Sequence, residues 1–260
     1  MSDGDHPSPS APAGGPRFAT VVFDCDSTLS AIEGIDVLAG ADPRVRELTD
    51  AAMAGRLPLD AVYGERLSLT RPDRARIDDL ARRYVAALVP DARQVVGALL
   101  RAGVHVHVVS GGLRPALLPL AAELGIDAGA VHAVDLRLDD AGDFDGWQED
   151  SPLARAGGKL ALLRSLADVL PRPVLLVGDG ATDLEARDAV DLFVAYAGVV
   201  ERPNVTAAAD VVIRSASLAP LLPLALAADA SERGDRAVRE RGARLWREGL
   251  VEDRREREAG

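Results

Sequence analysis

The sequence predicts an α/β protein with a doubly wound parallel sheet, a small helical cap inserted after the first strand, and a β-hairpin insertion. Short apolar runs alternate with segments of helical periodicity, as in a parallel sheet with helices on both faces. Residues 31–90 show helical stripes but no clear strand. Residues 131–147 alternate apolar and polar side chains around the turn-forming segment Asp-Asp-Ala-Gly-Asp.

The apolar runs and the helical stripes give the order of the elements. A first strand is predicted at 19–23, and the later strands at 104–109, 173–177, 192–195 and 210–213. Apolar residues spaced by three and four predict helices at 92–101, 113–124, 159–170, 182–189 and 218–228. The insertion at 31–90 follows the first strand, so we expect it over the carboxyl end of the sheet, where open α/β sheets bind ligands.

The chain therefore divides into a core at 17–30 and 91–230, a helical cap at 31–90, and two ends. Residues 1–16 are rich in Pro, Ser, Gly and Asp, and we expect a disordered leader. Residues 231–260 form a charged tail with nine arginines and eight acidic residues. The tail is either a helix with i, i+4 ion pairs or disordered, and Leu245, Trp246 and Leu250 form a possible docking stripe.

Composition excludes several classes of protein. A net charge of −11 and 3% aromatic residues argue against a nucleic-acid-binding surface. No apolar run approaches the ~20 residues of a membrane span, and no secretory signal is visible. The single cysteine, Cys25, excludes an intrachain disulfide, so we expect a cytoplasmic protein. The sequence does not indicate an oligomeric state.

Two carboxylates, Asp24 and Asp26, follow the first predicted strand. Such a pair is costly at a strand end unless a cation neutralises it, and carboxylate and carbonyl oxygens suit Mg²⁺. The ordinary alternative is a turn or a helix cap. This motif alone does not decide between them.

Three further segments fall at strand ends or helix starts of the same predicted sheet. Ser110 and Gly111 follow the second strand and suit phosphate oxygens. Asp179 and Asp183 follow the third. Lys159 opens a helix, where the helix dipole disfavours a cation. Each has an ordinary alternative (a turn, a capping residue, a surface lysine), but together they predict one site.

The choice of lysine at position 159 is unusual in this chain. Of 30 basic residues, 29 are arginine. A compact ammonium and a guanidinium are not interchangeable. We therefore expect Lys159 to have a role that requires an ammonium group.

The ordered set Asp-Cys-Asp-Ser-Thr, Ser-Gly-Gly, Lys and Gly-Asp-Gly-Ala-Thr-Asp resembles the haloacid dehalogenase superfamily, and within it the phosphoserine phosphatases. The resemblance covers roughly residues 18–228 and is densest at 24–36 and 178–186. It implies the Rossmann-like core of that superfamily and a Mg²⁺-dependent hydrolase whose substrate is a small phosphomonoester, phosphoserine.

The resemblance also implies roles for individual residues. Asp24 is the nucleophile that forms an aspartyl-phosphate, and Asp26 is the general acid and base. The metal ligands are the Asp24 carboxylate, the Asp26 carbonyl and Asp179, with Asp183 as a ligand or an orienting neighbour. Lys159 bridges Asp24 and the phosphoryl group, whose oxygens Ser110 and Gly111 hold.

The substrate would be recognised mainly by the cap. Glu33 resembles the family glutamate that binds the substrate ammonium, and Arg66 the arginine that pairs with its carboxylate. Met53 resembles a methionine that shields the site. Thr182 and Arg202 complete the predicted substrate set. Each of these residues also has an ordinary explanation when it is taken alone. Glu33 could be an acid on a helix surface, Arg66 and Arg202 two of 29 arginines, and Met53 a packing residue of the core.

Some positions depart from the family pattern or have ordinary explanations. Leu113 stands where an aromatic residue is usual, and Val134-Asp135 follows Ala133 where an Ala-Asn pair is usual. Another phosphatase or a phosphotransferase of the superfamily, or a non-catalytic binding module, therefore remains an alternative. We expect Cys25 to pack in the core, and His105 and His107 to be sheet residues more often than a metal pair.

Overall fold

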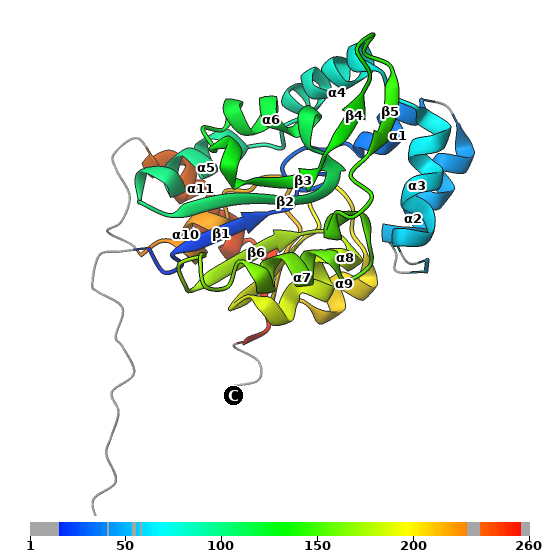
Figure 1. Ribbon diagram of the computed structural model, residues 1–260. Helices are drawn as coiled ribbons and strands as arrows, with labels where there is room; N and C mark the ends of the chain where they lie inside the picture. The colour runs from blue at the N-terminus through cyan, green and yellow to red at the C-terminus, as the bar shows by residue number, and fades with distance from the viewer. Residues whose placement is uncertain (1–15, 41, 54–55, 58, 228–234, 256–260) are drawn as a thin grey trace, which may run out of the picture.

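The computed structural model describes residues 16–40, 42–53, 56–57, 59–227 and 235–255. A seven-stranded sheet lies at the centre of the molecule, in the order β3-β2-β1-β6-β7-β8-β9 (Figure 1). All neighbours in it are parallel except β8 and β9. The predicted α/β fold is confirmed. The strands are β1 (Thr20–Phe23), β2 (His105–Leu113), β3 (Val131–Val134), β6 (Val174–Gly178), β7 (Leu192–Tyr196), β8 (Val211–Ile213) and β9 (Val251–Asp253).

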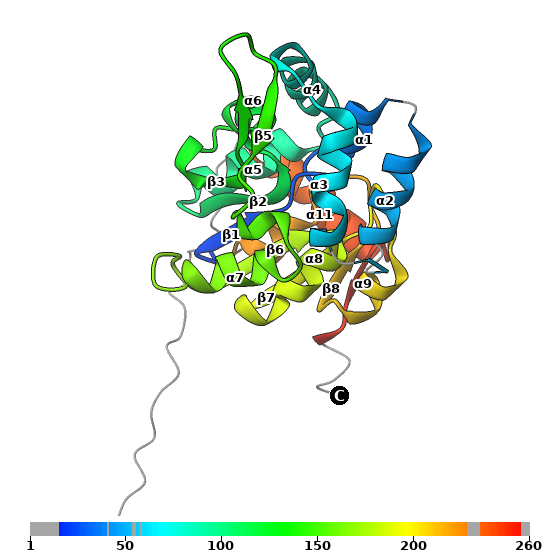
Figure 2. The ribbon, with the colours of Figure 1, turned by 45° about the vertical axis from the view of Figure 1, so that its right-hand side comes forward.

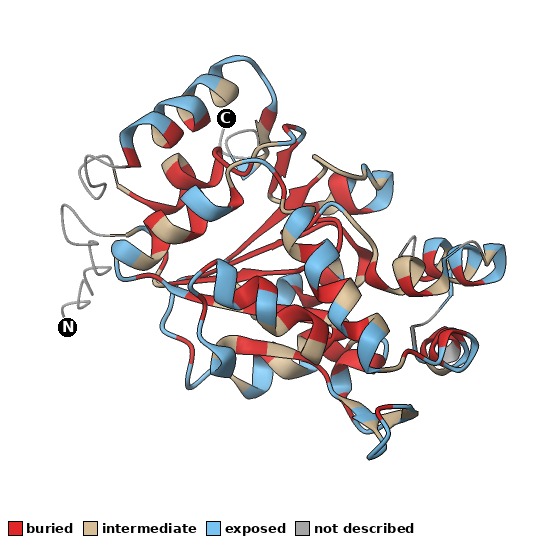
Figure 3. Cartoon of the chain, turned by 90° about the horizontal axis from the view of Figure 1, so that it is seen from above, coloured by how far each residue is buried: buried red, intermediate tan, exposed pale blue. Residues whose placement is uncertain are grey.

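The central strands are apolar throughout because both faces of the sheet are covered. Every residue of β1, β6 and β7 is buried, as Figure 3 shows by the red strands. Parallel strands covered on both faces read as continuous apolar runs. This is why the apolar runs predicted these strands.

Helices cover the sheet on both sides (Figure 1). On one side lie α5 (Ala92–Arg101) and α6 (Arg114–Glu123), and on the other α7 (Gly158–Ser165), α8 (Ala181–Glu185) and α9 (Pro203–Ala208). The helix α10 (Leu221–Ala225) packs against α5. Short 3₁₀ turns connect the elements at η1 (Ala128–Ala130), η2 (Pro152–Ala154) and η3 (Ala186–Ala189).

The insertion after β1 is helical, as predicted, and forms a cap beyond the carboxyl end of that strand (Figures 1 and 2). It contains α1 (Gly34–Ala39), α2 (Pro43–Met53), α3 (Leu59–Thr70) and α4 (Arg74–Ala86). The Asp73 side chain caps α4 by accepting from the Arg76 N–H at 2.8 Å. The predicted stripe of α4 is buried: Ile77, Leu80, Ala81 and Tyr84.

The prediction of a hairpin over the whole of 131–147 is wrong in its first part. The hairpin consists of β4 (Leu136–Leu138) and β5 (Phe144–Trp147). Residues 131–134 instead form β3, an edge strand of the main sheet parallel to β2. An edge strand that is only partly covered alternates polar and apolar residues as a hairpin does, so the pattern does not separate the two.

The charged C-terminal segment adds a helix and a strand to the core. α11 (Arg236–Arg247) carries i, i+4 pairs, Arg236–Glu240 at 2.8 Å and Arg244–Glu248 at 3.6 Å. The Trp246 indole N–H donates to the Pro220 carbonyl at 3.0 Å, which docks α11 beside α10. β9 then pairs with β8 in the main sheet. The composition of this segment did not predict that strand.

Two findings concern the remaining parts of the chain. The leader predicted at 1–16 lies outside the described residues except for Pro16, which pairs with Leu226. Within the part of the chain that the structure describes, no helix is both long enough and apolar enough to span a membrane.

The docking of α11 can be tested at Gly242, which is buried in that helix. A Cβ there would overlap the backbone carbonyl of Ala219, which cannot move aside easily. We expect Gly242→Ala to lower the free energy of unfolding by ~1–3 kcal/mol, measured by urea denaturation.

The matched control is Arg236→Ala in the same helix, which removes an exposed ion pair with Glu240. Exposed ion pairs contribute little to stability, so this variant should be about as stable as the wild type. Equal stabilities for the two variants would mean that α11 is not packed on α10.

Candidate active site

Two neighbouring strands bring Asp24 and Asp179 together. Asp24 follows β1 and Asp179 follows β6, and the two strands are in register near their ends, with Phe23 beside Val177. The Asp24 N–H donates to the Val177 carbonyl at 2.9 Å. The connections of the sheet run in opposite directions from β1 and β6, and such a switch point is where α/β sheets form their ligand crevice.

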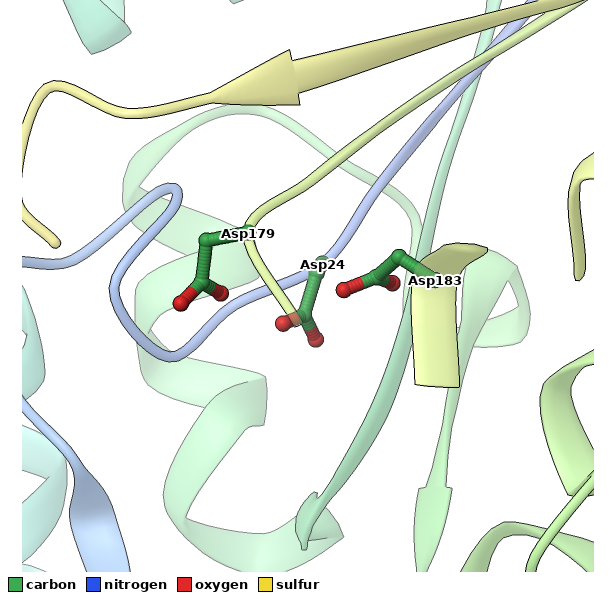
Figure 4. Close-up of side chains that lie close together, drawn as sticks. All are labelled: Asp24, Asp179 and Asp183. Atoms are coloured by element: carbon green, nitrogen blue, oxygen red, sulfur yellow. The ribbon is translucent and has the colours of Figure 1, made fainter. Parts of the chain in front are cut away.

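Asp183, at the start of α8, completes a cluster of three buried aspartates. One carboxylate oxygen from each of Asp24, Asp179 and Asp183 lies within 4.8 Å of the others (Figure 4). The Asp183 carboxylate also accepts from the Gly180 N–H at 3.0 Å. Gly178 must be glycine because a Cβ would overlap the Asp183 carboxylate.

Lys159 lies between two of these carboxylates. Its Nζ is 2.9 Å from Asp24 Oδ1 and 2.6 Å from Asp183 Oδ1, and the side chain is 5% exposed. Burial by itself lowers the pKa of Lys159, but Asp183 and Asp24 outweigh burial and raise that pKa above its ordinary value. The predicted lysine is therefore a buried partner of the site, and its two carboxylate neighbours favour its charged form.

Arg202, just before α9, is the second cation of the cluster. Its Nε is 3.0 Å from Asp179 Oδ2, and its Nη2 is 3.5 Å from Glu33 Oε1. The other oxygen of Asp179, Oδ1, is buried and has no hydrogen-bond partner among the described residues. Burial and the charge of Asp24 raise the pKa of Asp179 to about 8 against the influence of Arg202.

These residues fit a divalent metal ion. A buried carboxylate oxygen without a partner is costly, and a hard cation coordinated by oxygen would satisfy it. Burial also raises the pKa of Asp183, to about 6, although Lys159 favours its charged form. The described cations in contact with the three aspartates are Lys159 and Arg202, so the cluster has charge left for an ion to balance.

Asp26 is held apart from this cluster by a separate set of hydrogen bonds. Its Oδ1 accepts from the Gly34 N–H at 2.5 Å and from the Tyr84 hydroxyl at 2.8 Å. Its Oδ2 lies 3.5 Å from the Ser110 hydroxyl. Burial, and then the charge of Asp24, raise the pKa of Asp26 to about 6. This is a suitable value for a group that gives and takes a proton near neutral pH.

The sequence did not identify Tyr84 and Gly34 as partners of Asp26. Tyr84 was part of an apolar stripe, and nothing in the spacing indicates that its hydroxyl reaches residue 26. Gly34 must be glycine because a Cβ would overlap the Tyr84 hydroxyl. The two residues therefore depend on each other through their contact with Asp26.

The Ser-Gly-Gly segment lies beside Asp26, within the last residues of β2 and not after the strand as predicted. The Ser110 hydroxyl oxygen accepts from the Gly112 N–H at 3.0 Å. A Cβ at Gly112 would be 3.2 Å from both that hydroxyl and Asp26 Oδ2, so glycine allows the close approach. The carbonyl of Gly111 accepts from the Tyr63 hydroxyl of the cap at 2.9 Å.

The cap residues Glu33 and Arg66 face the same cavity as the core residues. Glu33 Oε1 accepts from the Ser27 hydroxyl at 2.7 Å, and burial, then Asp26, raise the pKa of Glu33. Arg66 is buried, and its Nη1 donates to the Thr49 hydroxyl at 3.3 Å. Burial lowers the pKa of Arg66. Eight predicted residues line the cavity: Asp24, Asp26, Glu33, Arg66, Ser110, Gly111, Lys159 and Thr182.

The remaining predicted residues lie beside or outside this cavity. Asp179, Asp183 and Arg202 contact its walls from the side of the sheet. Met53 is the last residue of α2, and its side chain lies outside what the structure describes. The cavity is also lined by residues that the sequence did not single out as site residues, among them Tyr63, Leu153 and Arg155.

The structure also places the cysteine and two of the histidines. Cys25 is fully buried. His107 Nδ1 lies 3.3 Å from His132 Nε2 on the neighbouring strand, so its contact is with His132 and not with His105 as a metal pair would require. Within the described residues, the three aspartates are the only group of three or more potential ligands placed to hold a metal.

Comparison with known proteins identifies the family. The model of the haloacid dehalogenase-like hydrolases matches residues 21–187. The chain is 38% identical over 196 residues to the chloroplastic phosphoserine phosphatase of Arabidopsis thaliana, covering 73% of this chain and 66% of the relative. It is 36% identical over 189 residues to the phosphoserine phosphatase of Homo sapiens, covering 71% of this chain and 84% of the relative.

A solved structure, described as the phospho-aspartyl intermediate analogue of phosphoserine phosphatase, has the same fold. It is 27% identical, with a TM-score of 0.66, and the match covers 79% of this chain and 98% of the other. The family match, the relatives and the shared fold agree with the cluster of aspartates at the end of β1 and β6. The chain belongs to the haloacid dehalogenase-like hydrolases.

Proposed function

We propose that this hydrolase is a Mg²⁺-dependent phosphoserine phosphatase, which converts O-phospho-L-serine to L-serine and phosphate at the end of serine biosynthesis. One observation carries the proposal. A single cavity holds an aspartate paired with a lysine, and also holds an acid and an arginine from the cap. The first pair suits a phosphoryl group, and the second suits the ammonium and carboxylate of an amino acid.

In the first half-reaction, Asp24 attacks phosphorus while the bond from phosphorus to the seryl oxygen breaks. Lys159 donates to Asp24 Oδ1, which leaves the other carboxylate oxygen to act as the nucleophile. Asp26 gives its proton to the leaving oxygen, and its raised pKa of about 6 keeps part of the population protonated. The product is an aspartyl-phosphate, as in the analogue captured for the related phosphatase.

In the second half-reaction, Asp26 takes a proton from water, and the water oxygen attacks phosphorus. The bond from phosphorus to Asp24 breaks, so that phosphate leaves and the carboxylate is restored. The hydrogen bonds from Gly34 and Tyr84 hold the Asp26 carboxylate in one position for both transfers. Ser110 and Gly111 hold the phosphoryl oxygens, next to Asp26.

The ion would be held by the Asp24 carboxylate, the Asp26 backbone carbonyl and Asp179, whose Oδ1 lacks a partner in the described structure. Asp183 orients this set because it binds Lys159 and the Gly180 N–H. When bound, Mg²⁺ reduces the repulsion between the nucleophilic carboxylate and the phosphate dianion. Arg202 holds Asp179 and Glu33 in place from the other side.

Glu33 and Arg66 recognise the amino-acid part of the substrate. Glu33 would receive the ammonium group, and the Arg66 guanidinium the carboxylate. Thr182 lines the cavity as a further polar contact, and Met53 of α2 would shield it. The predicted cytoplasmic location stays a prediction, since one relative is described as chloroplastic.

A panel of phosphorylated metabolites, assayed for phosphate release with Mg²⁺, tests the substrate. We expect phosphoserine to have the highest kcat/KM, and EDTA to abolish activity. Asp24→Asn should lower kcat by about 10⁴-fold or more while the unfolding midpoint is retained. Preference for another phosphoester, or transfer of phosphate to another alcohol, would favour a different member of the superfamily. Lack of activity on every substrate would indicate a binding module.

Carboxylate recognition is tested by Arg66→Ala. We expect KM for phosphoserine to rise by about tenfold or more, the factor of one lost charge-assisted contact, while KM for p-nitrophenyl phosphate changes little. The control is Arg44→Ala, which removes an exposed cap arginine that pairs with Glu65. If KM rises equally for both substrates, Arg66 does not read the carboxylate.

The need for an ammonium at position 159 is tested by exchanging it. Lys159 is buried between two carboxylates, where a planar guanidinium is too broad to approach both Asp24 and a phosphoryl group. We expect Lys159→Arg to lower kcat by about 10²–10³-fold, nearly as much as Lys159→Ala. Substantial activity of the arginine variant on phosphoserine would contradict this role.

A further inference from the structure

Tyr63 of the cap helix α3 contacts both the core and Arg66. Its hydroxyl donates to the Gly111 carbonyl at 2.9 Å. Its ring centroid lies 5.7 Å from the Arg66 guanidinium carbon. Tyr63 and Arg66 are three positions apart and lie on the same face of α3, which allows the Tyr63 ring to contact Arg66. The hydroxyl at the end of the same side chain reaches Gly111. Neither contact takes part in the reaction described above.

The hydroxyl contact exists only while the cap lies against the core. Tyr63 is 6% exposed, and a buried phenol needs an acceptor. Burial raises the pKa of Tyr63, so its hydroxyl keeps the proton that it donates. The acceptor belongs to the segment 110–112, which also places Ser110 beside Asp26. Movement of α3 away from β2 would break this bond.

The ring contact restrains the guanidinium of Arg66. On one side Arg66 Nη1 donates to Thr49, whose hydroxyl in turn donates to Asp36 at 3.0 Å. On another side lies the face of the Tyr63 ring, which attracts a cation. The buried Nε of Arg66 has no partner in the described part of the chain. Two cap groups therefore hold the guanidinium, and its Nε–H is among the donors left for a ligand.

The β4-β5 hairpin supports the position of the Tyr63 ring. Trp147 of the hairpin strand β5 lies 6.4 Å from Tyr63 between ring centroids. A Cβ at Gly64 would be 3.1 Å from the Trp147 ring, so glycine allows α3 to lie close to the hairpin. The hairpin also lies beside α4 of the cap (Figures 1 and 2). The Arg74 N–H of that helix donates to the Gly142 carbonyl of the hairpin at 2.9 Å.

We propose that Tyr63 is a positioning residue that determines specificity: its hydroxyl holds the cap closed on residues 110–112, and its ring orients Arg66 toward a substrate carboxylate. The role of the ring in orienting Arg66 rests on the proposed function. Loss of the hydroxyl affects every phosphoester equally because residues 110–112 hold the phosphoryl group. Loss of the ring has a further effect only on substrates that carry a carboxylate.

The experiment compares Tyr63→Phe and Tyr63→Leu on two substrates, O-phospho-L-serine and O-phosphoethanolamine, which lacks the carboxylate. We expect Tyr63→Phe to lower kcat/KM about fivefold for both, the factor of one ordinary hydrogen bond. We expect Tyr63→Leu to lower it about fivefold more for phosphoserine alone, through KM. The control is Tyr196→Phe, which removes a buried hydroxyl that donates to Ala216 away from the cavity and should change neither value.

Two outcomes would overturn the proposal. If Tyr63→Phe matches the wild type on both substrates, the hydroxyl does not hold the cap. If Tyr63→Leu lowers kcat/KM equally for both substrates, the ring is only packing. Tyr63→Phe keeps the ring and so tests the first half even if Tyr63→Leu does not fold. Failure of the wild type on phosphoserine would overturn the proposed function instead, and the hydroxyl would then be tested with p-nitrophenyl phosphate.

Discussion

Four aspartates are buried around the ends of β1 and β6, and the arrangement of the site depends on cations and hydrogen-bond donors that stabilise them. Lys159 shares its one charge between Asp24 and Asp183, and Arg202 pairs with Asp179. Asp26 instead accepts hydrogen bonds from Gly34 and Tyr84. Buried carboxylates cost free energy unless cations or donors surround them, and burial accordingly raises the pKa values of Asp26, Asp179 and Asp183. The buried carboxylates are gathered at the carboxyl ends of the strands, where the cap also lies.

The constraint explains several small residues around the site. Gly178 lies against Asp183, Gly34 against Tyr84, and Gly112 against Asp26. Gly158 precedes Lys159 and lies against the Pro152 carbonyl, so that α7 begins close enough to deliver the ammonium group. A side chain at any of these positions would push apart elements whose hydrogen bonds and ion pairs form only at short range.

The cap has a different physical role. The core carries the residues proposed for the phosphoryl chemistry, while Arg66 and Tyr63 reach the cavity from α3. Their contacts depend on where the cap lies, because Tyr63 donates to a core carbonyl. The cap is thus tied to the core by directional bonds at the cavity and by the hairpin at its outer side.

Local patterns in the sequence were sufficient for the central strands, the helical insertion and the motifs at the strand ends. A buried parallel strand is apolar over its whole length, and a helix repeats every 3.6 residues, so both are visible locally. β3 and β9 lie at the edges of the sheet, where partly exposed strands lack that signal. Short helices such as α9 are too brief to show a period.

For the site, the residue types and their order determined which groups would meet at the end of the sheet. Asp24 and Asp179 could be named because parallel strands end at the same edge, and Lys159 and Asp183 because they lie at helix starts that face it. Only the tertiary structure decided the partners of each group: Tyr84 on Asp26, Arg202 on Asp179, and Tyr63 on Gly111. These contacts join residues at least 23 positions apart, and such pairings arise from packing of the cap, the sheet and the loops, not from any local pattern.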